Sequence, residues 1–139
     1  MASLAPLLQR TKAKPHVPVV LIVDDEPDVL ESLADLIEQG FSYRAVTASS
    51  GPKALDILGK RPVDAVVSDY RMPVMDGCEF LREAKARHPG IPRLMLTAYP
   101  TPEVEDEACG DIGVRALLHK PVDPDRLGSE LQAALADEA

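Results

Sequence analysis

Residues 65–77 read AVVSDYRMPVMDG, and they contain the most informative pattern of the chain. The first four are small or apolar without alternation, which is typical of a strand covered on both faces of a sheet. Asp69 ends this run, and Asp76-Gly77 marks a turn in which we expect glycine to permit an unusual backbone conformation. A buried strand that ends on a carboxylate and turns into a helix indicates a βα unit of a parallel sheet.

The same alternation extends outward over most of the chain. Strands are expected at residues 19–23, 44–48, 65–68, 94–96 and 116–118. Helices are expected at residues 29–37, 50–59, 77–87, 102–109 and 124–136, with Gly40 stopping the first of them. Five β–α repeats imply right-handed crossovers and therefore an α/β fold, in which a doubly wound parallel sheet lies between two layers of helices.

Composition restricts the class of protein. The 139 residues fit one domain, and a hydrophobic fraction of 45% suffices for one core. Residues 1–18 hold three basic side chains and no acid, and we expect a flexible tail there, followed by one domain over residues 19–139. The 12 basic and 23 acidic side chains of that domain disfavour direct binding of nucleic acids. No apolar run approaches membrane-spanning length, and Cys78 and Cys109 show no metal or redox spacing, so a cytoplasmic protein with reduced cysteines is expected.

Polar side chains follow four of the five expected strands. Asp24 and Asp25 follow the first, Asp69 the third, Thr97 the fourth and Lys120 the fifth. In open α/β sheets, sites lie beyond the carboxyl ends of the strands, so these side chains should meet. Three clustered carboxylates would raise one another's pKa values, and Mg²⁺, which prefers oxygen ligands, relieves that conflict. A carboxylate nucleophile with Mg²⁺, a lysine and a hydroxyl can stabilise phosphoryl transfer.

Over roughly residues 19–137 the chain resembles the receiver domains of response regulators in two-component systems. The matching segments are Val23-Asp24-Asp25-Glu26-Pro27, the ten residues from Ser68 to Gly77, Leu96-Thr97-Ala98 and Lys120-Pro121. Each segment alone is weakly specific, whereas all four in this order are highly specific. The resemblance implies a flavodoxin-like (βα)5 sheet with the strand order 2-1-3-4-5.

The resemblance also implies a role for each site residue. Asp69 would accept the phosphoryl group. Asp25 and Asp69 would bind Mg²⁺ directly, together with the backbone carbonyl of Arg71, whereas Asp24 would act through a metal-bound water. Thr97 would rotate to bond the phosphoryl group.

Lys120 would pair with the phosphoryl group, and the Lys120–Pro121 peptide bond would be cis. The implied donor is a sensor histidine kinase or a histidine phosphotransfer domain. The positions expected to contact the donor are Glu26, Asp28, Val29, Ser32, Pro121 and Val122. Because nothing follows the last expected helix, we predict a stand-alone regulator that binds an unknown downstream protein or passes its phosphoryl group on, with a homodimer also considered.

Two departures from the family pattern affect regulation. Leu117 stands where the family usually has a switch aromatic, so we expect phosphorylation to be read out mainly through the helix at residues 102–109.

Arg71 and Tyr99 flank the implied approach of the water that hydrolyses the acyl phosphate. Neither side chain is an acid or amide that would orient this water, so a long-lived phosphorylated form is predicted, unless both side chains turn into solvent.

Other interpretations remain open at this point. Taken singly, Asp24 reads as a helix N-cap, Asp69 as a turn residue, Thr97 as a strand end and Lys120 as a solvated charge. A flavodoxin-like electron carrier shares the architecture, but acids after the first strand would repel the flavin phosphate. A dehalogenase-like phosphatase expects a second aspartate where Arg71 stands. A phosphorylation-independent interaction module would usually have lost one of the site residues.

Overall fold

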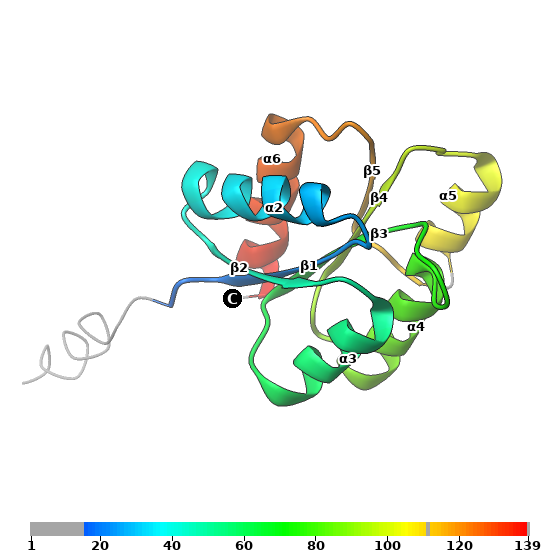
Figure 1. Ribbon diagram of the computed structural model, residues 1–139, viewed down its shortest axis with the longest axis horizontal. Coiled ribbons are helices and arrows are strands. Elements are labelled where there is room, and N and C mark those ends of the chain that lie inside the picture. Colours follow the sequence, from blue (N-terminus) through cyan, green and yellow to red (C-terminus); the bar gives the residue numbers. More distant parts are fainter. Residues whose placement is uncertain (1–15, 111, 139) are drawn as a thin grey trace, which may run out of the picture.

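A sheet of five parallel strands forms the centre of the computed structural model, which describes residues 16–110 and 112–138 (Figure 1). The strands are β1 (Val19–Val23), β2 (Arg44–Ala48), β3 (Ala65–Asp69), β4 (Arg93–Thr97) and β5 (Ala116–His119). Their order is β2-β1-β3-β4-β5, with parallel pairing throughout. The predicted flavodoxin-like fold and its strand order are therefore confirmed. Most of the tail predicted for residues 1–18 lies outside the described residues.

Helices cover both faces of the sheet, as Figure 1 shows. One layer contains α3 (Gly51–Lys60), α4 (Gly77–Arg87) and α5 (Pro102–Cys109), and the other contains α2 (Pro27–Asp35) and α6 (Pro124–Glu138). The first predicted helix differs in detail, because α2 ends at Asp35 and the π-helix η2 (Leu36–Gly40) continues it. All five expected helices are present.

The apolar strand runs explain how one sheet carries two cores. Alternate side chains of β1 point to opposite faces, so Leu21 and Val23 pack against α3, α4 and α5, whereas Val20 and Ile22 pack against α2 and α6. All four are at most 1% exposed. Burial on both faces requires apolar residues without alternation, which is the pattern that the sequence shows.

The turn between β3 and α4 differs from the sequence-based expectation. Asp76 is the N-cap of α4, and its carboxylate accepts a hydrogen bond from the backbone N–H of Glu79 (2.9 Å). Gly77 has no positive φ, and the unusual conformation belongs to Val74 (φ +72°). Glycine is required at position 77 by close approach, since a Cβ there would lie 2.2 Å from the carbonyl oxygen of Asp69.

Arg93 is a buried charge in the first position of β4, one residue before the strand expected at residues 94–96. Its guanidinium donates to the carbonyls of Ile91 (2.9 Å) and Gly113 (3.3 Å) at the amino edge of the sheet. Burial lowers the pKa of this side chain. Arg93 therefore ties the loops that enter β4 and β5, far from the strand ends where the polar residues gather. None of the described helices combines the length and the apolar character needed to cross a membrane.

Candidate functional site at the carboxyl ends of the strands

The sheet brings the predicted polar side chains together at its carboxyl edge. Asp24, Asp25 and Asp69 each place a carboxylate oxygen within 4.8 Å of the others. Asp24 (1% exposed), Asp69 (7%) and Thr97 (1%) are buried, whereas Asp25 is exposed. Because β1 and β3 are adjacent and parallel, their ends fall side by side.

Lys120 joins two of the three carboxylates. Its Nζ lies 3.0 Å from Asp24 Oδ2 and 3.0 Å from Asp69 Oδ1. The backbone N–H of Lys120 donates to the carbonyl of Thr97 (2.8 Å), which ties the end of β5 to the end of β4. The Lys120–Pro121 bond is cis, as predicted. Burial by itself would lower the pKa of Lys120, but the hydrogen bonds to Asp24 and Asp69 outweigh it, and the net pKa is raised.

Both oxygens of Asp24 are engaged inside the protein. Oδ2 faces Lys120, and Oδ1 accepts a hydrogen bond from the backbone N–H of Glu26 (2.9 Å). Glu26, rather than Asp24, occupies the N-cap position of α2, so the interpretation of Asp24 as a helix N-cap is wrong. Its place favours a role in holding Lys120 and leaves Asp25 as the carboxylate exposed to an incoming cation.

Asp69 carries an electrostatic conflict that a cation would relieve. Burial and the nearby Asp24 carboxylate raise its pKa, while the hydrogen bond and charge of Lys120 and the backbone N–H of Tyr70 oppose the rise. A hard divalent cation beside Asp24, Asp25 and Asp69 would neutralise the excess negative charge with the oxygen ligands that Mg²⁺ prefers. The donor set therefore fits Mg²⁺.

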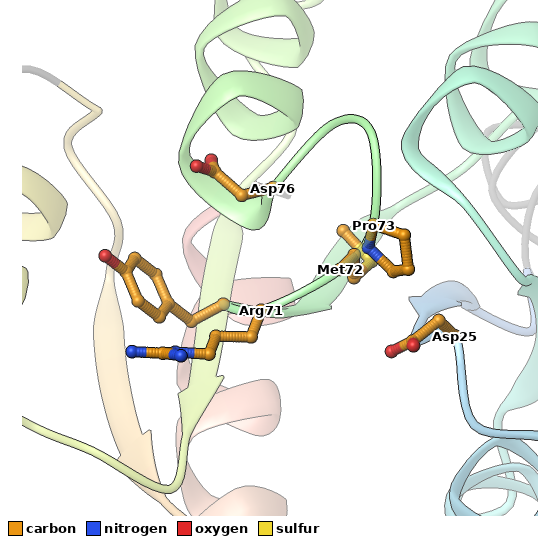
Figure 2. A pocket seen from close by; sticks show the side chains of 6 residues that line it. Asp25, Arg71, Met72, Pro73 and Asp76 are labelled. Carbon is orange, nitrogen blue, oxygen red and sulfur yellow. The ribbon is translucent and has the colours of Figure 1, made fainter.

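An open pocket adjoins these carboxylates (Figure 2). The residues that line it are Asp25, Tyr70, Arg71, Met72, Pro73 and Asp76. Figure 2 shows Asp25 and Pro73 on the same side of the pocket, whereas the guanidinium of Arg71 points away from Asp25. That guanidinium lies 5.2 Å from the centre of the Tyr99 ring, so the two residues predicted to flank the water path form a cation–π contact.

The two predicted switch positions lie in different surroundings. The Thr97 hydroxyl accepts a hydrogen bond from the backbone N–H of Tyr99 (3.0 Å). Leu117 is half-buried and packs against the core beneath α3, α4 and α5. A branched aliphatic residue there offers no hydroxyl, so any coupling to Thr97 through this position must be steric.

An apolar groove lies on the other side of Lys120, between α2 and the loop after β5. The residues that line it are Asp28, Val29, Ser32, Leu33, Leu96, Lys120, Pro121 and Val122. Five of the six predicted donor contacts therefore border one surface, and Glu26 does not line it. Leu33 and Leu96 were not expected there, because their apolar character in a helix and a strand indicates only core.

On the opposite side of the sheet a second polar cluster links α4 to α5. Arg82 Nη2 lies 2.8 Å from Glu107 Oε2. Glu107 also accepts from the thiol of Cys78, and burial followed by the charge of Glu107 raises the pKa of that thiol to about 12. Cys78 is free, as its spacing predicted, and it is also buried; its high pKa makes it a poor nucleophile.

Comparison with known proteins identifies the family. A family model described as the response regulator receiver domain matches residues 20–132. The chain belongs to this family. Receiver domains are phospho-acceptor switches of two-component signalling, and the match overturns the flavodoxin-like and phosphatase interpretations.

Curated relatives and solved structures agree with this assignment. The receiver domain is 39% identical over 127 residues to the transcriptional regulatory protein GlrR of Escherichia coli (strain K12), covering 89% of this chain and 28% of the relative. It is 40% identical over 117 residues to ZraR of Escherichia coli O157:H7, covering 84% of this chain and 26% of the relative. The chain thus spans about a quarter of the length of these relatives.

Two solved structures show the same fold. A signal receiver domain of an HD domain-containing protein from Pseudomonas fluorescens Pf-5 superposes with a TM-score of 0.84 at 29% identity, covering 88% of this chain and 98% of the other. The chemotaxis protein CheY4 of Vibrio cholerae superposes with a TM-score of 0.80 at 32% identity, covering 86% and 100%. The receiver fold therefore accounts for nearly all of the described residues.

Proposed function

We propose that this receiver domain accepts a phosphoryl group on Asp69 from the phosphohistidine of a sensor histidine kinase or a histidine phosphotransfer domain. The observation that carries the proposal is the bridge of Lys120 between Asp69 and Asp24, beside a third carboxylate, at the sheet edge. One carboxylate oxygen of Asp69 would attack phosphorus. The bond from phosphorus to the donor nitrogen would break, and an acyl phosphate would form.

The roles of the surrounding groups follow from charge. Mg²⁺, when bound, supplies positive charge to the phosphoryl oxygens, and Asp25, Asp69 and the carbonyl of Arg71 are its proposed ligands. Lys120 already lies 3.0 Å from Asp69 and would remain paired with the new anion. The Thr97 hydroxyl would leave the N–H of Tyr99 and donate to a phosphoryl oxygen.

We propose that the donor docks on the apolar groove beside Lys120. Val29 is half-buried there, at the start of α2, and Pro121 and Val122 face it from the loop after β5. Val29→Asp should slow transfer from a phosphorylated kinase by about tenfold or more, because it places a charge in an apolar contact. Labelling by acetyl phosphate, which needs no docking surface, should persist. Loss of labelling by both donors would indicate a folding role instead.

Several finer predictions rest on the sequence alone. An unknown downstream protein, a homodimer and a cytoplasmic location are proposals, and the curated relatives are about four times as long as the matched region. With Leu117 in place of an aromatic, we propose that readout runs mainly through α5, which Arg82 and Glu107 tie to α4.

The decisive experiment is labelling with acetyl phosphate and Mg²⁺, followed by mass spectrometry of peptides. We expect one phosphoryl group, on Asp69, and none in Asp69→Ala or in EDTA. Asp56→Ala is the matched control, because Asp56 is an exposed carboxylate that pairs with Lys60 on α3. Full labelling of Asp69→Ala would overturn the proposal.

A further inference from the structure

Tyr70 directly follows the phospho-acceptor, and its backbone is held by two neighbouring elements. Its N–H donates to the carbonyl of Leu96 in β4 (2.8 Å), and its carbonyl accepts from the N–H of Gly77 at the start of α4 (2.8 Å). Tyr70 also separates Asp69 from Arg71, which supply two of the proposed Mg²⁺ ligands. Any shift of this segment when the site is occupied therefore moves Tyr70 as well.

The Tyr70 side chain connects the phospho-acceptor pocket with the contact between α4 and α5. It lines that pocket and packs, half-buried, against the core that Val104 and Ala108 of α5 enter. Burial raises the pKa of its phenol, and the nearby Cys78 and Glu107 raise it further. The hydroxyl therefore lies close to the polar groups that join the two helices.

Glu107 is the acceptor on which these polar groups converge. Arg82 Nη2 lies 2.8 Å from its Oε2, and the thiol of Cys78 donates to it as well. Within residues 16–110 and 112–138 the Tyr70 hydroxyl forms no hydrogen bond, so it is a third donor near this carboxylate. Arg82 and Glu107 are 40% and 43% exposed, so water screens their ion pair and another donor can compete with it.

We infer that Tyr70 transmits the state of Asp69 to α5 by donating its hydroxyl to Glu107, and this inference rests on the proposed function. The position where the family usually has a switch aromatic is occupied by Leu117, which packs against the same core but has no hydroxyl. Tyr70 places an aromatic hydroxyl in that core from the opposite direction, next to the phospho-acceptor itself. When occupancy of the site shifts the backbone of Tyr70, its hydroxyl competes for Glu107 and loosens the ion pair that holds α5 to α4.

The test uses two matched tyrosine variants and hydrogen–deuterium exchange of α5. Tyr70→Phe removes the hydroxyl and keeps the ring and its packing. Tyr43→Phe is the control, because Tyr43 is also half-buried but lies beside Phe41 and packs against the core on the other face of the sheet. Each full chain is labelled with acetyl phosphate and Mg²⁺. Mass spectrometry then follows exchange in peptides from residues 102–109 and, as an internal reference, from residues 51–60.

In the wild type, labelling should speed exchange in α5, because the ion pair between Arg82 and Glu107 is loosened. Tyr70→Phe should be labelled as the wild type is, but the increase in exchange should be at least about threefold smaller, as expected for a residue that carries coupling. Glu107→Ala should exchange fast before labelling, and adding Tyr70→Phe to it should change nothing further, because both substitutions remove one contact. Tyr43→Phe should respond as the wild type does.

Five outcomes would overturn the inference. A full increase in Tyr70→Phe, with Asp69 labelled, would refute the coupling role and leave the proposed function intact. Loss of labelling in Tyr70→Phe would give the hydroxyl a role at the phospho-acceptor instead, and an equally reduced response in both tyrosine variants would indicate a general effect on the fold. A labelled wild type whose α5 does not respond would refute the route to α5. A wild type that acetyl phosphate does not label would refute the proposed function as well.

Discussion

At the scale of single residues, the site is organised by one lysine between two carboxylates. The Nζ of Lys120 lies 3.0 Å from a carboxylate oxygen of Asp24 and 3.0 Å from one of Asp69. The other oxygen of Asp24 accepts a hydrogen bond from the backbone N–H of Glu26. The three acids, which look equivalent in the sequence, therefore have different surroundings. Asp24 is fully engaged, Asp69 is buried with a raised pKa, and Asp25 is exposed.

These different surroundings predict different effects on metal binding. Asp25→Asn removes an exposed anionic ligand and should weaken Mg²⁺ binding by about 100-fold or more. Asp24→Asn should weaken it by about tenfold, as expected for a group that acts through a neighbour or a water. Isothermal titration calorimetry measures both, with circular dichroism as the check on folding. An equal loss in the two variants would contradict the assignment.

The contact between Arg71 and Tyr99 predicts a slow loss of the acyl phosphate. Both side chains are exposed, and the Arg71 guanidinium points away from Asp25 (Figure 2), so the pair does not cover the pocket; what it lacks is an acid or amide to orient a water. Arg71→Asn combined with Tyr99→Glu should shorten the lifetime at least about tenfold, since positioned acid–base groups contribute on the order of 100-fold. Decay of phosphorylated protein in excess Mg²⁺ measures it, with Arg61→Asn as a surface control. An unchanged lifetime would show that the pair does not gate the water.

At the scale of elements, the connection from β3 to α4 fixes the position of Asp69 at the end of β3. The N–H of Gly77 donates to the carbonyl of Tyr70 (2.8 Å), so the first turn of α4 is closed onto the end of β3. The same helix contacts α5 through Arg82 and Glu107. Both ion-pair partners are about 40% exposed, so this pair contributes at most about 1 kcal/mol and suits a contact that opens and closes.

Gly77→Ala should disrupt this connection. The added Cβ would lie 2.2 Å from the Asp69 carbonyl oxygen and 2.9 Å from the Tyr70 Cα, and neither backbone atom can move without shifting the site. We expect a loss of about 1–3 kcal/mol in the free energy of unfolding, with slower labelling of Asp69. Gly59→Ala is the control, because no atom lies within 4 Å of its added Cβ and alanine favours a helix. Equal stability of the two variants in urea would refute the argument.

At the scale of the whole molecule, part of the stability is given up for the site. The fold buries Asp69 beside Asp24 within a chain of net charge −8, and the raised pKa of Asp69 records this cost. Lys120 offsets it only in part. Burying a carboxylate at a sheet edge is unfavourable for folding and useful for binding a cation.

This cost predicts how stability depends on pH. Below the ordinary pKa of 3.8 the Asp69 side chain is protonated in both states, and Asp69→Asn should resemble the wild type. As pH rises through the raised pKa, the folded state holds the proton more tightly than the unfolded state, so the wild type loses stability relative to the variant. Urea unfolding across this range without metal should show Asp69→Asn becoming the more stable protein, and Mg²⁺ should narrow the gap. A gap that does not vary with pH would contradict the prediction.

The sequence by itself determined the order of elements, the two-faced burial of the strands and the identity of the strand-end residues. Each of these depends on neighbours in the chain, because apolar periodicity and strand ends are local properties. The family motifs then implied the strand order and the cis bond before Pro121, and both are present.

Only the tertiary structure decided how these residues meet. Lys120 is 96 positions from Asp24, and no local pattern states that its ammonium bridges two carboxylates. The same holds for the turn before α4, where the sequence predicts an unusual φ at Gly77 and the structure has it at Val74. Distances between segments arise from the packing of the whole sheet and its helices. The sequence therefore names the candidate site residues, and the fold sets how deeply each one is buried and which charges surround it.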